Sequence, residues 1–191
     1  NFSRPSTAGG RIIEMNADNK YAEVTINGGQ FTTGKADAMI LNGTNSRFIV
    51  NGGTFEATGN CAMFQANEGI LTITGGTFSS ANTTVGSDGA VVDAYKTGTC
   101  NITIDNKNDI NVTGGGIFLK QQSTSAINIT GLDIEQEGTI IDIGSNGGSI
   151  TLNDCTLASK TSAIVSKSAN TVYVKDYSVI SSKDTLAIDG V

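Results

Sequence analysis

The chain has 191 residues with a formal net charge of −6, and it contains 24 Gly, one Pro, no Trp and no His. The lack of His excludes imidazole general bases, Ser/His and Cys/His nucleophile pairs and the commonest metal ligand. The 12 Lys and Arg are scattered and no apolar run reaches the roughly 18 residues of a membrane span, so we expect neither nucleic acid nor membrane insertion.

A short motif returns along the chain with a regular period. It reads Val-Thr-Ile-Asn-Gly-Gly-Gln-Phe at 24–31, Phe-Ile-Val-Asn-Gly-Gly-Thr-Phe at 48–55 and Leu-Thr-Ile-Thr-Gly-Gly-Thr-Phe at 71–78. Degenerate copies begin at residues 102, 127, 150 and 172. Neighbouring copies are 22 to 25 residues apart, except for one step of 31 between the third and fourth copies. Such self-similarity is typical of repeat architectures.

Two further apolar rows follow the same period. The second row lies just after the motif's corner and comprises Phe31, Phe55, Phe78, Ile110, Ile134, Leu157 and Val179. The third row consists of the pairs Ala38/Ile40, Ala62/Phe64, Ala90/Val92, Ile117/Leu119, Thr139/Ile141, Ala163/Val165 and Leu186/Ile188. Each repeat therefore predicts three short strands separated by Gly, Asn, Asp or Ser, and none shows helical periodicity.

This pattern predicts an all-β fold, a single-stranded right-handed parallel β-helix (a solenoid) of about seven coils. Each strand pairs with its equivalent one coil on, about 4.8 Å away, and the usual chirality of parallel crossovers gives the right hand. Residues 1–191 are expected to form one repeat domain, with the coil expanded at 79–110. Because neither end shows a polar cap for the terminal coil, we expect an excerpt of a longer chain.

The Gly-Gly-Thr-Phe coils at 52–55 and 75–78 resemble the right-handed β-helix repeats of the pectin-lyase-like superfamily, which are common in bacterial adhesin-like surface proteins. The resemblance covers residues 12–191. The resemblance is compatible with either a binding protein or an enzyme. It implies that an enzyme of the lyase type would need calcium, clustered acidic residues and an Arg base. None of Arg4, Arg11 and Arg47 has a matching acidic cluster, so the sequence favours a protein that is not an enzyme.

The leading hypothesis is a non-catalytic, extracellular shaft or adhesin-like binding segment of a bacterial surface protein. Its expected partner is a host glycan or a surface polysaccharide, with no cofactor and no metal. Two alternatives stay open: a polysaccharide-active lyase or hydrolase of pectin-lyase-like fold, and a phage tail-spike or virion fibre segment, which would place the chain on a virion surface instead of a cell surface.

The expanded coil supplies the candidate ligand-binding residues, because protrusions from a solenoid often lie on a binding face. These candidates are Ser87, Asp88, Tyr95, Lys96, Lys107 and Asp109. A row of alternating charge, formed by Asp93, Lys120 and Asp142, is predicted to be a surface charge ladder. Cys61, Cys100 and Cys155 are predicted to be buried free thiols.

One further row is predicted to be an apolar interface stripe. If Ala38 and Ile40 face inward, the residue between them faces out, and the same holds in the other coils. The stripe then consists of Met39, Met63, Val91, Phe118, Ile140 and Ile164. An apolar line of this length marks an interaction surface, so we expect a second copy of the protein, as in a homo-oligomer, or a flanking domain to cover it.

Overall fold

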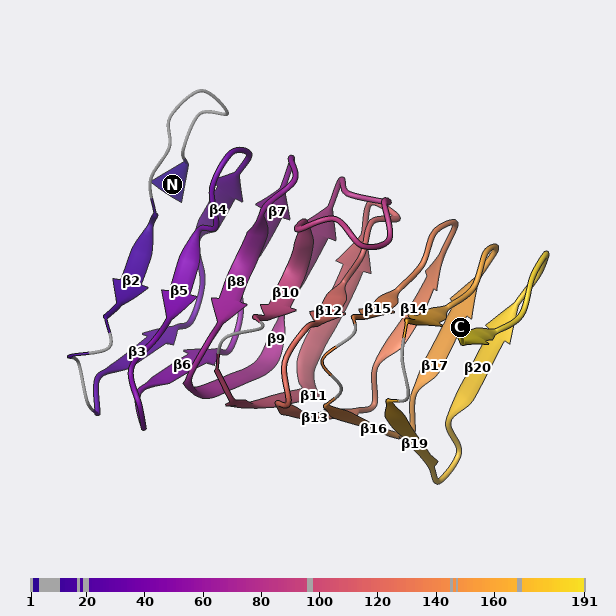
Figure 1. Cartoon of the computed structure of the whole chain (residues 1–191). Coiled ribbons are helices and arrows are strands. Elements are labelled where there is room, and N and C mark those ends of the chain that lie inside the picture. Colours follow the sequence, from indigo (N-terminus) through magenta and orange to yellow (C-terminus); the bar gives the residue numbers. More distant parts are fainter. Residues whose placement is uncertain are drawn as a thin grey trace.

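The computed structural model describes residues 2–3, 11–16, 18, 21–95, 98–144, 146, 148–167 and 170–190. It is a parallel β-solenoid of about seven coils, in which the chain advances along one axis from the first coil to the last (Figure 1). The described residues contain no α-helix, so none of them forms a helix that could cross a membrane. The predicted repeat architecture is therefore confirmed, while its right-handed winding stays a prediction.

The first row of strands forms part of a ten-stranded sheet. Its strands are β3 (Glu23–Ile26), β6 (Arg47–Val50), the first halves of β9 (Gly69–Ser80) and β11 (Cys100–Thr113), β13 (Ala126–Thr130), β16 (Ser149–Asn153) and β19 (Thr171–Lys175). Neighbours pair in parallel and in the register that the repeat predicts, from Val24 opposite Phe48 to Ile150 opposite Val172.

The second row follows the corner of each coil. It comprises β1 (Phe2–Ser3), β4 (Gln30–Thr33), β7 (Thr54–Ala57), the second halves of β9 and β11, β14 (Asp133–Gln136), β17 (Thr156–Ser159) and β20 (Val179–Ser182). The early members belong to the ten-stranded sheet, whereas β14, β17 and β20 form a separate three-stranded sheet. The strands β9 and β11 differ from the rest because they run through the corner without a break.

The third row forms an eight-stranded parallel sheet on another side of the coil. Its strands are β2 (Ile13–Met15), β5 (Met39–Leu41), β8 (Ala62–Ala66), β10 (Ala90–Ala94), β12 (Leu119–Gln121), β15 (Ile141–Ile143), β18 (Ile164–Ser166) and β21 (Ile188–Gly190). This sheet carries the candidate site on its outer face.

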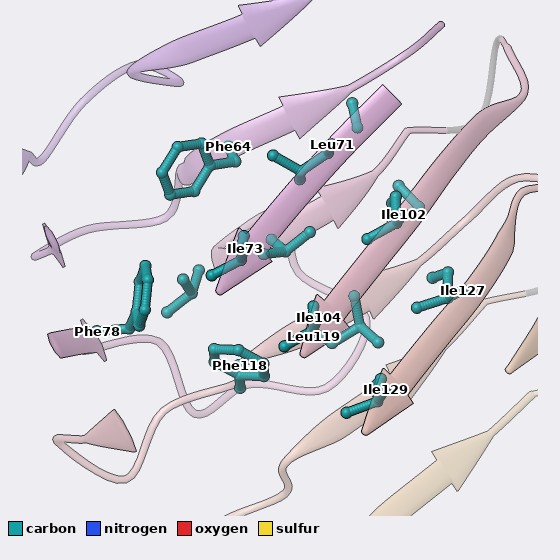
Figure 2. Close-up of a cluster of buried hydrophobic side chains, with 14 of the residues drawn as sticks. Phe64, Leu71, Ile73, Phe78, Ile102, Ile104, Phe118, Leu119, Ile127 and Ile129 are labelled. Atoms are coloured by element: carbon teal, nitrogen blue, oxygen red, sulfur yellow. The ribbon is translucent and has the colours of Figure 1, made fainter. Parts of the chain in front are cut away.

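The core runs along the axis as columns of equivalent side chains. Figure 2 shows Leu71, Ile102 and Ile127 on the neighbouring strands β9, β11 and β13 of one sheet, with Ile73, Ile104 and Ile129 on the same strands. All six are buried. Because apolar burial contributes about 25 cal/mol per Å², each coil stabilises its neighbours through these columns.

The Gly-Gly-x-Phe corners are explained by stacked aromatic rings. The ring of Phe55 lies 5.0 Å from that of Phe31 and 5.0 Å from that of Phe78, with nearly parallel planes. The second glycine of each motif has a positive φ, 126° at Gly53, and a Cβ there would lie 3.1 Å from the Phe55 ring. Glycine is needed at this position both for its backbone conformation and for the ring that packs over it.

The second apolar row departs from the sequence alignment in two coils. In β11 a bulge between Ile104 and Ile110 shifts the register, so Val112 pairs with Phe78 while Ile110 lies opposite Gly76. In the last coil Ile180 pairs with Leu157, and Val179 is 52% exposed. Inserted corner residues cannot be located by the period alone, which explains both differences.

The predicted interface stripe is wrong, because its residues belong to the core. Each of the six side chains has an exposed fraction of 0% and packs in the hydrophobic cluster: Met39, Met63, Val91, Phe118, Ile140 and Ile164. A second copy or a flanking domain therefore cannot dock on them.

The stripe fails for two different reasons. Met39 and Ile164 lie in the inward position of their strands, opposite Phe64 and Ile141. In these two coils the sequence alignment of the third row is therefore shifted by one residue. The other four precede the inward residue at a corner where two consecutive side chains turn inward. The backbone is irregular there: in one corner the N–H groups of Phe118 and Leu119 both donate to the carbonyl of Ile140.

The first coil provides a matched test of the glycine corner. We expect Gly29→Ala to lower the free energy of unfolding by at least about 1–2 kcal/mol, because φ is 116° and the new Cβ would lie 3.1 Å from the Phe31 ring. Gly28→Ala is the control, since no heavy atom lies within 4 Å of its Cβ position. Urea denaturation followed by circular dichroism measures both. Equal effects of the two substitutions would contradict the explanation.

Candidate functional site

The site is built around the connection between β9 and β10, residues 81–89, which we call the strap. The corresponding connection one coil earlier, between β7 and β8, is only residues 58–61. The side chain of Asn82 holds the strap in shape: its Nδ2 donates to Ser87 Oγ at 2.6 Å and to the Gly89 carbonyl at 2.6 Å. Its Oδ1 accepts from the Thr84 N–H at 3.2 Å. The strap is therefore a compact loop closed by its own side chains.

Beneath the strap lies the row of alternating charge. Asp93, Lys120 and Asp142 are paired in register on β10, β12 and β15 and point to the outer face of the eight-stranded sheet. Their exposed fractions are 2%, 3% and 1%. The prediction of a surface charge ladder is wrong in this respect, because all three charged side chains are buried.

The strap is fastened to two of the three buried charges. Its Gly86 N–H donates to Asp142 Oδ2 at 2.7 Å. Lys120 Nζ donates to the carbonyl of Ser87 and lies 3.2 Å from Asp88 Oδ1. Because β12 and β15 follow β10 along the axis, the strap leans forward over two further coils, as Figure 1 shows.

The ion pair between Lys120 and Asp88 is asymmetric. The lysine side chain is 3% exposed and the aspartate side chain 71% exposed. Solvent screens the exposed end, so the pair itself contributes little. Removing Asp88, however, would leave the Ser87 carbonyl as the remaining hydrogen-bond partner of the buried ammonium among the described residues, and breaking a buried ion pair is costly.

Asp93 is the most perturbed carboxyl group at the site. Burial raises its pKa from 3.8 to about 7, against the lowering effect of the Gln122 amide and the Lys120 charge. Gln122 Nε2 lies 2.9 Å and 3.1 Å from the two carboxyl oxygens. Burial also raises the pKa of Asp37, whose Oδ1 accepts from the Ala62 N–H at 2.7 Å. Asp93 is therefore protonated in part of the molecules at neutral pH.

Asp142 is incompletely satisfied. Its Oδ2 accepts from the strap, but its Oδ1 is buried and has no hydrogen-bond donor among the described residues. A buried acceptor without a partner costs about 1–3 kcal/mol. The structure thus carries a place where an additional donor would be stabilising.

A cavity of about 220 Å³, the strap cavity, opens between the strap and the coils of β12 and β15. Its lining residues are Gly86, Lys120, Gln122, Asp142, Gly144, Asn146 and Lys167. Lys167 Nζ lies close against Gly86, in the space that a Cβ would occupy. Within the described part of the chain the Lys167 ammonium forms no ion pair or hydrogen bond. The strap cavity therefore combines a cation and a carboxylate oxygen that both lack partners among the described residues.

A larger groove lies elsewhere, along β14, β17 and β20. It has a volume of about 660 Å³ and includes Glu137 and Lys160, which already form an ion pair at 3.1 Å. Its polar groups come mainly from exposed strand ends. The strap cavity is the stronger candidate because two buried charged side chains, Lys120 and Asp142, line it, whereas the charged residues of the groove are exposed.

The sequence-predicted site residues divide into two groups. Ser87 and Asp88 lie in the strap, as described above. Tyr95 follows β10, where it is half-buried and its N–H donates to the Ala66 carbonyl at 2.9 Å. Lys96 lies outside the described residues. Lys107 and Asp109 lie in the β11 bulge, where Lys107 pairs with Asp105 at 2.6 Å.

The expanded coil is therefore two separate features, and neither Lys107 nor Asp109 lines the strap cavity. Sequence reasoning missed the contributions of Gln122, Asn146 and Lys167 from later coils. The row of Asp93, Lys120 and Asp142 was visible in the repeat, but its burial was not.

The three cysteines are free and buried, as predicted. Burial raises the pKa of each thiol, in the case of Cys100 to about 12. Thiols of this kind are unreactive, since the thiolate is the nucleophile. In the described ranges no three His, Cys, Asp or Glu side chains are grouped so that they could hold a metal ion.

Comparison with known proteins adds no relative from which a function could be transferred. No protein family, no curated protein and no solved structure matches the chain. The functional proposal therefore rests on the strap and its cavity.

The raised pKa of Asp93 predicts a pH-dependent stability. Between about pH 4 and pH 7 the folded protein retains the Asp93 proton that the unfolded chain has lost, so stability falls as pH rises through this window. The total effect is on the order of 4 kcal/mol. In Asp93→Asn this contribution is absent. Urea unfolding from pH 4.5 to pH 8 should show the variant gaining stability relative to the wild type as pH rises; a constant difference would contradict the assignment.

Proposed function

We propose that the chain is a non-catalytic binding segment: an extracellular, adhesin-like shaft of a bacterial surface protein, whose strap cavity binds a host glycan or a surface polysaccharide. The observation that carries this proposal is the pair of unpartnered groups in the cavity. Among the described residues the exposed Lys167 has no partner and the buried Asp142 Oδ1 has no donor, whereas Lys120 and Asp93 already have partners within the protein.

The solenoid supports a binding role by holding the site in place. The strap contacts residues of β12 and β15 in addition to its own coil, so its position is fixed by successive layers of the stack. A preorganised site loses less conformational entropy when the ligand binds. The outer face of the sheet also places the cavity on the side of the shaft, where a ligand can reach it.

The geometry of Asp93 favours binding over turnover. A carboxyl group with a pKa of about 7 suits a general acid at neutral pH. Asp93, however, is 2% exposed, and the Gln122 amide lies within hydrogen-bond distance of both its oxygens. A substrate bond cannot approach a carboxyl group that is buried and engaged in this way. The same burial therefore supports a structural role for Asp93 beneath the binding site.

A glycan array tests the proposal. Labelled wild-type protein should bind a subset of glycans, and Lys120→Met should reduce this binding at least about tenfold, because the strap loses the buried ammonium that fastens it. Methionine is expected to keep the fold, since apolar replacement of a buried charge is usually tolerated. Lys183→Met, on the exposed end of another coil, is the control.

Two outcomes would contradict the proposal. In the first, the wild type binds no glycan, or Lys120→Met binds as well as the wild type. In the second, incubation with the bound glycan releases shorter or unsaturated products, which would show that the segment is an enzyme.

A further inference from the structure

The strap cavity has a definite pattern of unmet bonding. Among the described residues Lys167, whose Nζ lies against Gly86, offers a cation without a partner, and Asp142, which accepts from the Gly86 N–H through Oδ2, has an Oδ1 that lacks a donor. A ligand that meets both needs carries an anionic group and, a short distance away, a hydrogen-bond donor. A neutral apolar ligand would satisfy neither group and would bury both.

The donor that faces Asp142 is better a hydroxyl than an ammonium. Lys120 and Lys167 both line the cavity, and they would repel a third cation supplied by a ligand. The side-chain amides of Gln122 and Asn146 also line it. Amides both donate and accept, and so complement hydroxyl groups, which do the same.

The size of the cavity limits how much of a ligand can enter. Its volume of about 220 Å³ is below the roughly 300–1,000 Å³ of pockets that bury drug-sized ligands. One sugar-sized unit fits this space, and an extended oligosaccharide does not. A chain end or a free small molecule can therefore enter, whereas the interior of a polymer cannot.

From these three constraints we propose that the strap cavity binds a single hydroxylated monoanion, a sugar acid that is free or at the end of a glycan. Its carboxylate faces Lys167, and one of its hydroxyls donates to Asp142 Oδ1. This inference rests on the proposed binding function and specifies its ligand. Lys167 supplies the preference for an acidic unit, and Asp142 supplies the preference for a hydroxyl.

Isothermal titration calorimetry with four probes tests the assignment: D-glucuronate, glucose, glucose 6-sulfate and acetate. The wild type should bind glucuronate at least about tenfold more tightly than glucose, which lacks the charge, and than acetate, which lacks the hydroxyls. If glucose 6-sulfate binds as tightly as glucuronate, the ligand is still a hydroxylated monoanion, but a sulfated sugar replaces the sugar acid as its identity. Equal binding of glucuronate and glucose, or of glucuronate and acetate, would overturn the proposal.

Two variants locate the binding. Lys167→Met should remove the preference for glucuronate over glucose, and it keeps the fold because Lys167 is exposed. Asp142→Asn should weaken both sugars about tenfold, since its amide nitrogen cannot accept the ligand hydroxyl while its oxygen still accepts from the Gly86 N–H. Lys183→Met should change neither affinity, and unchanged thermal midpoints control for folding.

These measurements separate the inference from the proposed function. If the wild type binds array glycans and loses them in Lys120→Met, yet Lys167→Met and Asp142→Asn bind glucuronate like the wild type, the ligand assignment is wrong and the binding function stands. If the wild type binds no probe and no array glycan, both are wrong.

Discussion

The spacing between coils is the constraint on which the rest of the molecule depends. Each strand pairs in register with its equivalent, so a residue in one coil lies about 4.8 Å from its counterpart in the next. This repetition suits the aromatic column of Phe31, Phe55 and Phe78, whose rings stack at 5.0 Å. It also forces charged residues at equivalent positions into contact range. Asp93, Lys120 and Asp142 alternate in sign for this reason, because like charges stacked at that distance would repel.

The strap turns this generic ladder into a local site. It binds Lys120 and Asp142 directly, next to Asp93, whose pKa is raised by burial. If every polar atom of Asp93, Lys120 and Asp142 had a hydrogen-bond partner within the protein, the region would have a purely structural role. Instead, Asp142 Oδ1 remains without a donor among the described residues. Local departures from complete pairing are typical of functional positions, where stability is lower than it could be.

The sequence predicted the regular parts of the fold and failed where the repeat is locally broken. The first apolar row, Val24 to Val172, was correct in every coil, because alternation and period together determine which residues face inward. The corner before each third strand was wrong, since two consecutive residues such as Phe118 and Leu119 both turn inward. Alternation cannot reveal such a corner. The β11 bulge misled the second row for the same reason.

The site was predictable only in part. The length of the connection pointed to Ser87 and Asp88, and the repeat pointed to the charged row. The direction in which the strap leans is a tertiary property, however, and it decides that the row is buried. It also decides that Lys167, from a later coil, meets Gly86 at the cavity. No local pattern marks that lysine.

The claim that the strap covers the charged row is tested most directly by amine-reactive labelling of the intact protein, read out by peptide mass spectrometry. Lys120 has a side-chain exposure of 3% and Lys107 one of 68%. We expect Lys120 to be labelled at least about tenfold more slowly than Lys107, because labelling requires the strap to open. Labelling of Lys120 at the rate of Lys107 would show that the strap does not cover the row, and the site would have to be abandoned.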